Sequence, residues 1–302
     1  MILFNLRKKM KINIIIILFL LFVKILQSSP IVDAKWLSKN ACKDNIKIIE
    51  VGVSFNSYIV EHVKCAKYTN FYNDGWRVVK NRVSMVLPSP DDLVKVVRSL
   101  EIENKDHIVL YAKKNTTYGM AEVTAIYFTF KYLGHENISI LNGGYPSFKK
   151  TESLFVEEGE YDKKITSKYV YKLNDTILAN SEDIINNQKN NLPIVDSREV
   201  DFFLGINKLS SFKKFGTIEK SINIPSKWFL ESRGLNFNNE NKINKIFSQV
   251  GLPEKEDVIF FCYAGLESSL NWFVSYELMK NSKAKLYEGS IFKWNQEKRL
   301  LN

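Results

Sequence analysis

The sequence predicts an α/β protein of two similar domains, each with a parallel five-stranded sheet and helices on both faces. Apolar runs typical of buried strands alternate along the chain with stretches of helical spacing. The segment 99–112 (SLEIENKDHIVLYA) aligns without a gap to 249–262 (QVGLPEKEDVIFFC), 150 residues further on. Each copy then continues into a helix, a strand and a glycine turn. This pattern indicates a duplicated domain rather than a solenoid, whose repeats run about 20–50 residues.

The first domain is expected at residues 31–150, because globular patterning begins at Ile31. Its predicted elements are strands at 46–51, 107–112 and 137–142 and helices at 91–100 and 121–133. Residues 151–167 are charged and lack periodicity, so we expect a linker there. The second domain follows at 168–302. Its predicted elements are strands at 193–196, 222–225, 257–262 and 284–287 and helices at 243–250 and 266–278.

Residues 1–29 are predicted to be a signal peptide. A cationic LRKKMK segment precedes the apolar run Ile12–Val23, and small polar residues follow it. The apolar run is too short for a comfortable membrane span, so we expect membrane attachment only if the segment is not cleaved. The expected destination is the secretory pathway or an organelle reached through it, rather than the mitochondrion.

Composition excludes several classes of partner. The chain has 302 residues and a formal net charge of +10. Part of that charge lies before Pro30, in Arg7, Lys8, Lys9, Lys11 and Lys24. The remaining basic residues are not clustered, so we expect no nucleic-acid partner. The three histidines are widely spread and no C-x-x-C motif is present, so we expect neither a metal nor a cofactor. A monomer that acts on small molecules is the expectation.

Cys262 is the candidate reactive residue. It ends the apolar run Val258–Phe261, and a tight turn containing Gly265 follows it into a helical pattern. Backbone N–H groups at such a strand-to-helix turn favour an anion and can hold a charged adduct on sulfur. Cys42 and Cys65 can pair in an oxidising compartment, which leaves Cys262 as the odd thiol. A buried structural cysteine is the alternative.

Several further motifs accompany this turn in a fixed order. They are IVDAKWL, EHVKCA (61–66), MVLPSPDDL, LNGGYPSF, DSREVDFFLG (196–205), GTIEKSINIP (216–225) and LYEGSIFKW. With these motifs, residues 31–302 resemble the tandem rhodanese-domain sulfurtransferases, the thiosulfate and 3-mercaptopyruvate sulfurtransferases. In that family, a cysteine of the second domain takes a sulfur atom from a donor as a persulfide and passes it to a thiol or cyanide acceptor.

The resemblance implies a role for each candidate residue. Cys262 is the implied nucleophile, whereas the first domain has Ala112 at the equivalent position. Asp196 is expected to support the cysteine loop. The implied substrate-binding residues are Tyr263, Ala264, Gly265, Leu266, Glu267, Ser268, Arg198 and Lys214, the last next to Lys213.

This chain also departs from the family pattern. The family's arginine before F-x-G is Phe202, its G-H-I histidine is Thr217, and its loop Ser or Thr residues are Ala264 and Glu267. His62 matches the histidine of the mercaptopyruvate triad, but Val51 stands near the place of its aspartate, so that triad is incomplete. An acid at 267 repels an anionic substrate and raises the pKa of a nearby thiol, so Glu267 is expected to act as a brake.

Two further hypotheses stand beside a sulfurtransferase. The departures favour a catalytically weakened persulfide carrier or binding module. A cysteine-dependent phosphatase needs an arginine six residues after the cysteine to clamp phosphate, and Ser268 occupies that place. Among sulfur donors, mercaptopyruvate is favoured over thiosulfate. The reason is that Tyr263 and Ala264 are neutral, where thiosulfate-preferring members carry cations.

Overall fold

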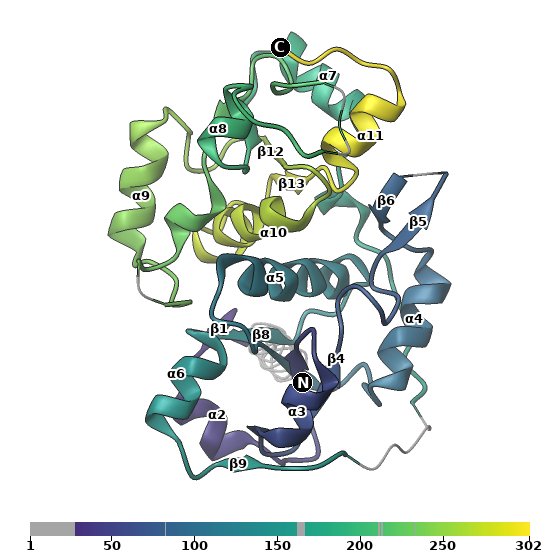
Figure 1. The fold of residues 1–302 in the computed structure, drawn as a ribbon, viewed down its shortest axis with the longest axis vertical. Coiled ribbons are helices and arrows are strands. Elements are labelled where there is room, and N and C mark those ends of the chain that lie inside the picture. The colour runs from purple at the N-terminus through teal and green to yellow at the C-terminus, as the bar shows by residue number, and fades with distance from the viewer. Residues whose placement is uncertain (1–27, 82, 162–166, 211, 213, 233) are drawn as a thin grey trace, which may run out of the picture.

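The computed structural model describes residues 28–302 except 82, 162–166, 211, 213 and 233 (Figure 1). The predicted signal segment therefore lies almost entirely outside the described residues. In the part that is described, no helix combines the length and the apolar character that a membrane crossing needs.

The first domain contains the predicted five-stranded parallel sheet. Its strand order is β1-β8-β7-β2-β4, and every neighbouring pair is parallel. The strands are β1 (Ile31–Val32), β2 (Ile46–Val51), β4 (Ala66–Thr69), β7 (His107–Ala112) and β8 (Ile138–Leu141). Two small antiparallel pairs join β3 (His62–Val63) to β9 (Val156–Glu157) and β5 (Val78–Lys80) to β6 (Val83–Val86). The predicted linker therefore contains β9.

Helices cover both faces of this sheet (Figure 1). They are α2 (Ala34–Asn40), α3 (Phe55–Val60), α4 (Pro90–Ser99), α5 (Thr117–Tyr132) and α6 (Gly144–Thr151). Helix α5 begins four residues earlier than the apolar spacing predicts, because Thr116 caps it: the Thr116 hydroxyl accepts a hydrogen bond from the Gly119 amide at 3.1 Å. This longer start brings Tyr118 into the first helical turn.

The second domain contains a smaller parallel sheet. It has four strands in the order β11-β10-β12-β13, with bounds Ile222–Asn223 (β11), Ile194–Asp196 (β10), Val258–Phe261 (β12) and Ala284–Leu286 (β13). The place of a fifth strand is taken by Leu178, which forms a single parallel bridge to Leu286. The prediction of five strands was therefore one too many for this domain, because the segment beside β13 pairs at one residue only.

The second domain's helices are α7 (Ser181–Lys189), α8 (Val200–Phe203), α9 (Glu240–Gln249), α10 (Leu266–Phe273) and α11 (Ser290–Gln296), with 3₁₀ turns at Asp175–Ile177 (η1) and Ser226–Phe229 (η2). Of these helices, the sequence predicted α9 and the start of α10 to within three residues, whereas α7, α8 and α11 were not predicted. The apolar face expected over 266–278 is continuous, but its last part, η3 (Val274–Leu278), is π-helical. The wider turn shifts the register of this face by one residue.

The internal repeat has a structural counterpart. Helix α4 and helix α9 lie 150 residues apart at both ends, and strands β7 and β12 follow them within one residue of the same offset. At the end of β7 the first domain has Ala112, which is fully buried, whereas the second has Cys262. The duplicated unit therefore presents a thiol from one domain only.

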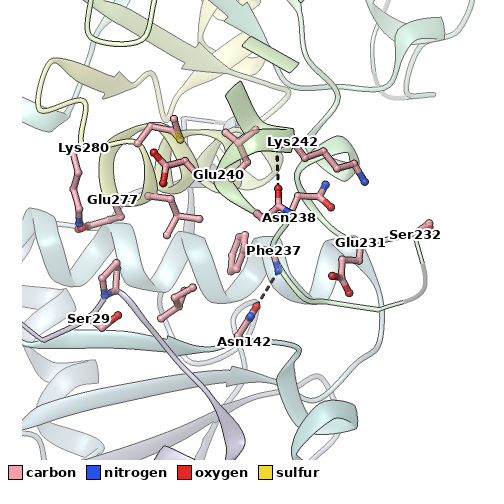
Figure 2. Close-up of a pocket in the computed structure, with 16 residues that line it drawn as sticks. Ser29, Asn142, Glu231, Ser232, Phe237, Asn238, Glu240, Lys242, Glu277 and Lys280 are labelled. Carbon is pink, nitrogen blue, oxygen red and sulfur yellow. Dashed lines mark hydrogen bonds between the residues drawn. The ribbon is translucent and has the colours of Figure 1, made fainter. Parts of the chain in front are cut away.

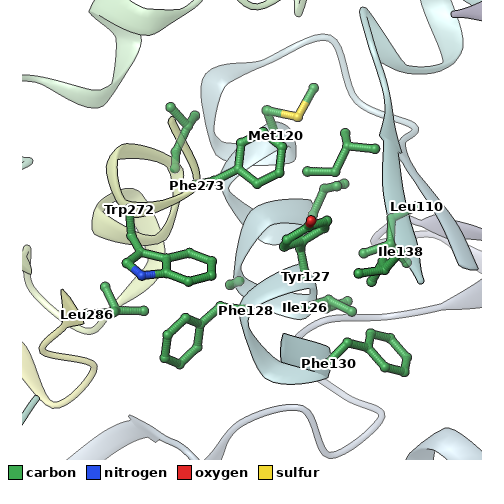
Figure 3. Packing of buried hydrophobic residues seen from close by; sticks show 14 of the residues in the cluster. Leu110, Met120, Ile126, Tyr127, Phe128, Phe130, Ile138, Trp272, Phe273 and Leu286 are labelled. Atoms are coloured by element: carbon green, nitrogen blue, oxygen red, sulfur yellow. The ribbon is translucent and has the colours of Figure 1, made fainter. Parts of the chain in front are cut away.

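The two domains meet along α5 and α10. Helix α5 is buried on almost every side, between the first sheet and α10 (Figure 1). Two perpendicular ring contacts cross the interface, Tyr127 with Phe273 and Phe128 with Trp272, each with centroids 4.8 Å apart (Figure 3). A single apolar cluster consequently runs through both domains.

Two buried ion pairs also cross the interface. Arg77 Nε lies 2.8 Å from Glu288 Oε1, and Lys131 Nζ lies 3.4 Å from Glu277 Oε1. Burial raises the pKa of Glu288 to about 7, although the Arg77 charge opposes this shift. In the Arg77–Glu288 pair, loss of one partner would leave a buried charge unpaired, which costs more than loss of the pair together. The pairs therefore fix how the domains dock.

Because the core is continuous, we expect the domains to unfold in one transition. Phe128→Ala should lower the free energy of unfolding by about 3–5 kcal/mol, since it removes a large buried ring. Leu154→Ala, at a side chain that is 98% exposed, is the control and should change stability by less than about 0.5 kcal/mol. Denaturant unfolding followed by near-ultraviolet circular dichroism measures both. Two separate transitions, of which Phe128→Ala shifts only one, would contradict the continuous core.

Candidate active site

The candidate site is the turn that follows β12. Cys262 directly follows this strand, is fully buried and is the free cysteine of the described chain. Gly265 then adopts a left-handed conformation with φ of +76° and caps the start of α10. A Cβ atom at this position would lie 2.9 Å from the backbone oxygen of Glu288, so a side chain does not fit. The glycine therefore lets the chain turn sharply beside the sulfur.

Hydrogen-bond donors converge on the sulfur atom. The hydroxyl of Ser268 donates to Sγ at 3.3 Å, and the backbone N–H groups of Ala264 and Ser268 also donate to it. Donors in these positions stabilise a negative charge on sulfur. The arrangement agrees with the cradle expected for the loop, with Ser268 supplying both a side chain and an amide.

Ser290 forms hydrogen bonds with the backbone of the loop. Its Oγ accepts hydrogen bonds from the amides of Cys262, at 3.1 Å, and Gly265, at 3.2 Å, and donates to the Tyr287 oxygen at 2.7 Å. The amide of Gly265 is thus used to shape the loop rather than to bind the sulfur. Ser290 belongs to the LYEGSIFKW motif quoted above, but the sequence did not reveal this role.

A network of buried hydrogen bonds lies at the end of β10. Asp196 accepts hydrogen bonds from the Arg198 guanidinium, with Nη2 at 2.6 Å, and from the Thr217 hydroxyl at 2.7 Å. Arg198 Nη2 also donates to the Gly216 oxygen at 2.9 Å. Both Asp196 and Arg198 are almost fully buried. These hydrogen bonds fix the guanidinium at the end of β10. Support of the cysteine loop by Asp196 and contact of Arg198 with a substrate both stay predictions.

The aromatic ring of Tyr263 packs between these groups. The Arg198 guanidinium lies over it at 4.6 Å, and the rings of Phe202 and Phe212 contact it with centroids 5.5 Å and 5.1 Å away. Phe202 stands where the family pattern has an arginine. The substitution replaces a positive charge near the loop with an apolar contact that fixes Tyr263.

Glu267 lies beside the thiol in the first turn of α10. Its carboxyl group interacts with Cys262, and its Oε1 accepts a hydrogen bond from Tyr118 Oη at 3.3 Å. Burial is the main cause that raises the pKa of Glu267 to about 7. Tyr118 belongs to α5 of the first domain, so both domains contribute to the surroundings of the sulfur. Nothing in the sequence pattern pointed to Tyr118.

The thiol of Cys262 is mostly protonated in this setting. Burial, and next the charge of Glu267, raise its pKa to about 11, while the donors from Ser268 and Ala264 oppose the shift. The direction of the Glu267 effect is the one expected for a like charge. Donors that favour a thiolate therefore surround the sulfur, while burial and the neighbouring carboxyl group oppose its ionisation.

Other candidate residues lie apart from this group or have no described contact with it. His62 contacts the Tyr58 oxygen of the first domain and the Glu157 carboxylate in β9. These contacts do not include the cysteine loop, and Ala264 lacks the hydroxyl group that the triad of the mercaptopyruvate enzymes needs. Lys214 is exposed, and its role as a substrate ligand stays a prediction. Lys213 lies outside the described residues.

A large cavity between the domains is not the site of the thiol. It has a volume of about 920 Å³ and is lined by parts of β1, α9 and η3 (Figure 2). Its wall includes Asn142, whose side chain accepts a hydrogen bond from the Phe237 amide at 2.9 Å. Cys262 does not line this cavity. In the described part of the chain, no cluster of side chains is arranged to hold a metal ion.

Comparison with known proteins agrees with this geometry. A model of the rhodanese-like domain matches residues 33–151 and 181–297. The chain is 24% identical over 268 residues to a Saccharopolyspora erythraea protein named "Putative thiosulfate sulfurtransferase", covering 86% of this chain and 91% of that protein. It is 23% identical over 277 residues to "Sulfur carrier protein TtuD" of Thermus thermophilus, covering 87% and 93%.

The fold comparison points the same way. The structure of SseA from Escherichia coli, described as a 3-mercaptopyruvate sulfotransferase with the rhodanese fold, superposes with a TM-score of 0.71 at 18% identity, covering 87% of this chain and 99% of that one. Two α/β domains, one of which carries a thiol in an anion-binding turn, define the class as a tandem sulfurtransferase. The chain belongs to the rhodanese-like domain family, and the resemblance found in its sequence is confirmed.

The electrostatic balance around the thiol is testable. Glu267→Thr should lower the pKa of Cys262 from about 11, because a like charge is removed, and should speed alkylation by iodoacetamide near pH 7. Ser268→Ala is the matched variant of opposite sign, since it removes a donor to the sulfur and should slow the reaction. Pseudo-first-order alkylation rates across pH measure both. An unchanged rate in Glu267→Thr would show that the carboxyl group does not act on the thiol, and a slower rate would show that its charge does not restrain the thiol.

Proposed function

We propose that the protein moves sulfane sulfur from thiosulfate or 3-mercaptopyruvate to a thiophilic acceptor through a persulfide on Cys262. The observation that carries the proposal is the convergence of the Ala264 amide, the Ser268 amide and the Ser268 hydroxyl on a free thiol at a strand end. Preorganised donors of this kind stabilise charge that develops in a transition state. They suit both the attacking thiolate and the persulfide anion that follows it.

Of the two donors, 3-mercaptopyruvate is the better candidate. Thiosulfate is a dianion and needs cations near the sulfur. The Arg198 guanidinium lies over the Tyr263 ring of the loop at 4.6 Å, and its hydrogen bonds go to Asp196 and Gly216. Glu267 adds partial negative charge on the same side. A donor with a single carboxylate is repelled less, and exposed Lys214 is the proposed partner for that carboxylate.

The alternative proposal is a weakened member that carries persulfide sulfur or binds a partner without fast turnover. Two observations favour it: the thiol is fully buried, and its pKa is raised to about 11. The name of the Thermus thermophilus relative, a sulfur carrier protein, fits this role as well. Turnover separates the two proposals, because a carrier accepts one sulfur atom and releases it only to its partner.

We also propose that the chain acts as a monomer in the secretory pathway or an organelle reached through it. Support comes from the Cys42–Cys65 disulfide of the first domain, since such bonds persist in oxidising compartments. The signal segment, if cleaved, leaves no membrane attachment. Expression in a secreting cell should yield a soluble chain with a new N-terminus close to Pro30. Retention in the cytosol with free Cys42 and Cys65 thiols would contradict this placement.

Loss of the thiol should abolish the activity. Cys262→Ser should form no thiocyanate from cyanide with either donor, because a serine hydroxyl is a far weaker nucleophile towards sulfur. The double variant Cys42→Ser/Cys65→Ser is the control and should keep the wild-type rate while losing stability, by about 3 kcal/mol. Thiocyanate is measured by its ferric complex. Substantial thiocyanate formation by Cys262→Ser would rule out the persulfide route. If the wild-type protein forms a persulfide but no thiocyanate, the carrier proposal is favoured.

A further inference from the structure

Three side chains from different parts of the fold interact in the order Cys262, Glu267, Tyr118. Cys262 follows β12, Glu267 lies in the first turn of α10, and Tyr118 lies in the first turn of α5. The Glu267 carboxyl group interacts with the thiol on one side and accepts the Tyr118 hydrogen bond on the other. The carboxyl group is therefore placed between a reactive thiol and a phenol that fixes its orientation.

The chemistry of sulfur transfer sets a problem for this thiol. A thiolate is the attacking species, but a thiol with a pKa of about 11 is ionised in roughly one molecule in 10⁴ at pH 7. The Cys262 proton must therefore leave as the reaction proceeds. Proton transfer to a positioned side chain removes this barrier, and such catalysis contributes about 10²–10⁴-fold.

The surroundings of Glu267 fit a proton carrier. Burial raises its pKa to about 7, close to neutral pH, where a base of this kind works best. The groups that act on it are Cys262, Asp196, Tyr118 and Arg198, and its own charge acts on Tyr72. Asp196 is already bound by Arg198 and Thr217. The charge of Glu267, and next burial, raise the pKa of Tyr118, so this phenol stays protonated and donates only.

We propose that Glu267 accepts the Cys262 proton during attack on the donor and delivers it to the leaving group, while Tyr118 positions the carboxyl group. This inference rests on the proposed function. Glu267 thus has two effects: its charge raises the pKa of the resting thiol, and its carboxyl group carries the proton in the transfer step. A threonine or serine at this place, as in the family pattern, lacks an acid that titrates near neutral pH.

With 3-mercaptopyruvate, the proton balance closes within the site. The Cys262 thiol and the donor HS–CH₂–CO–COO⁻ give the persulfide Cys262–S–SH and pyruvate. A bond forms between Sγ and the donor sulfur, and the bond from that sulfur to carbon breaks. The electron pair goes to the carbon, which becomes an enolate, and the Cys262 proton reaches this carbon through Glu267. Sγ is formally oxidised and the carbon is reduced, so no other reactant is needed.

With thiosulfate, the transfer step depends less on proton delivery to the leaving group. Attack on the outer sulfur expels sulfite, which takes the electron pair of the sulfur–sulfur bond and is stable as an anion. Delivery of a proton is then not required for departure. The two donors therefore differ in how strongly they depend on Glu267, and this difference separates proton delivery from a merely structural role.

The test is Glu267→Gln, which keeps the size of the side chain and removes the acid. For 3-mercaptopyruvate, kcat should fall by about 10²-fold, measured as pyruvate release in the presence of a thiol acceptor. For thiosulfate, kcat should fall less, because that step loses proton acceptance by Glu267 but needs no proton delivery to the leaving group. Glu199→Gln is the matched control, because this glutamate pairs with Lys227 and its charge also acts on Tyr118.

The pH profile gives an independent reading. The carboxyl group must be ionised to accept the proton, so kcat/KM for 3-mercaptopyruvate should fall as pH falls through about 7. Glu267→Gln should lose this acidic limb. Tyr118→Phe removes a donor that lowers the pKa of Glu267, so it should move the limb to higher pH. Tyr118 is 54% exposed, so the variant should fold normally.

The outcomes distinguish this inference from the proposed function. If the wild-type protein releases neither pyruvate nor sulfite, the proposed function fails. If it uses both donors and Glu267→Gln slows both equally or neither, the proton-carrier role is wrong and the proposed function stands. A wild-type enzyme that uses thiosulfate but not 3-mercaptopyruvate would also overturn the role. Selective loss of 3-mercaptopyruvate turnover, with the acidic limb lost, is the result that supports it.

Discussion

The contact between α5 and α10 is the constraint on which the site depends. Helix α10 begins at the cysteine turn, and α5 brings Tyr118 to Glu267 from the other domain. The hydroxyls of Thr124 and Ser269 lie 2.8 Å apart within this contact, which fixes the helices along their axes. A shift between the domains would move the phenol away from the carboxyl group. Packing at the interface therefore sets the chemistry of the thiol as well as the stability of the fold.

Duplication explains why both domains are needed for a single site. The first domain repeats the helix, strand and turn of the second, but Ala112 ends its strand where the other has Cys262. It supplies α5, which covers the sulfur loop, and Arg77, which pairs with Glu288 next to Gly265. One copy thus retains the reactive thiol, and the other copy closes the site and fixes the docking of the two domains. The burial that results raises the pKa values of Cys262 and Glu267 together.

Much of this arrangement could be predicted from the sequence, for identifiable reasons. The apolar runs and the repeat at 99–112 and 249–262 marked the strands, and the Cys-to-Gly265 turn marked the sulfur loop, because local spacing determines both. The second sheet has four strands where five were predicted. The sequence could not reveal this difference, because it depends on Leu178 pairing with β13 at one residue only. Tyr118 was also missed. Its contact with Glu267 joins residues from different domains, and only the docking of α5 on α10 creates it.

The central claim is that Cys262 receives sulfur from a donor. The most direct measurement is mass spectrometry of the intact protein and of its Cys262 peptide after incubation with 3-mercaptopyruvate or thiosulfate, followed by removal of the excess donor. The account predicts a gain of one sulfur atom, located on Cys262 and lost again after addition of cyanide or a thiol. A protein that gains no sulfur from either donor, or gains it on another residue, would contradict the account.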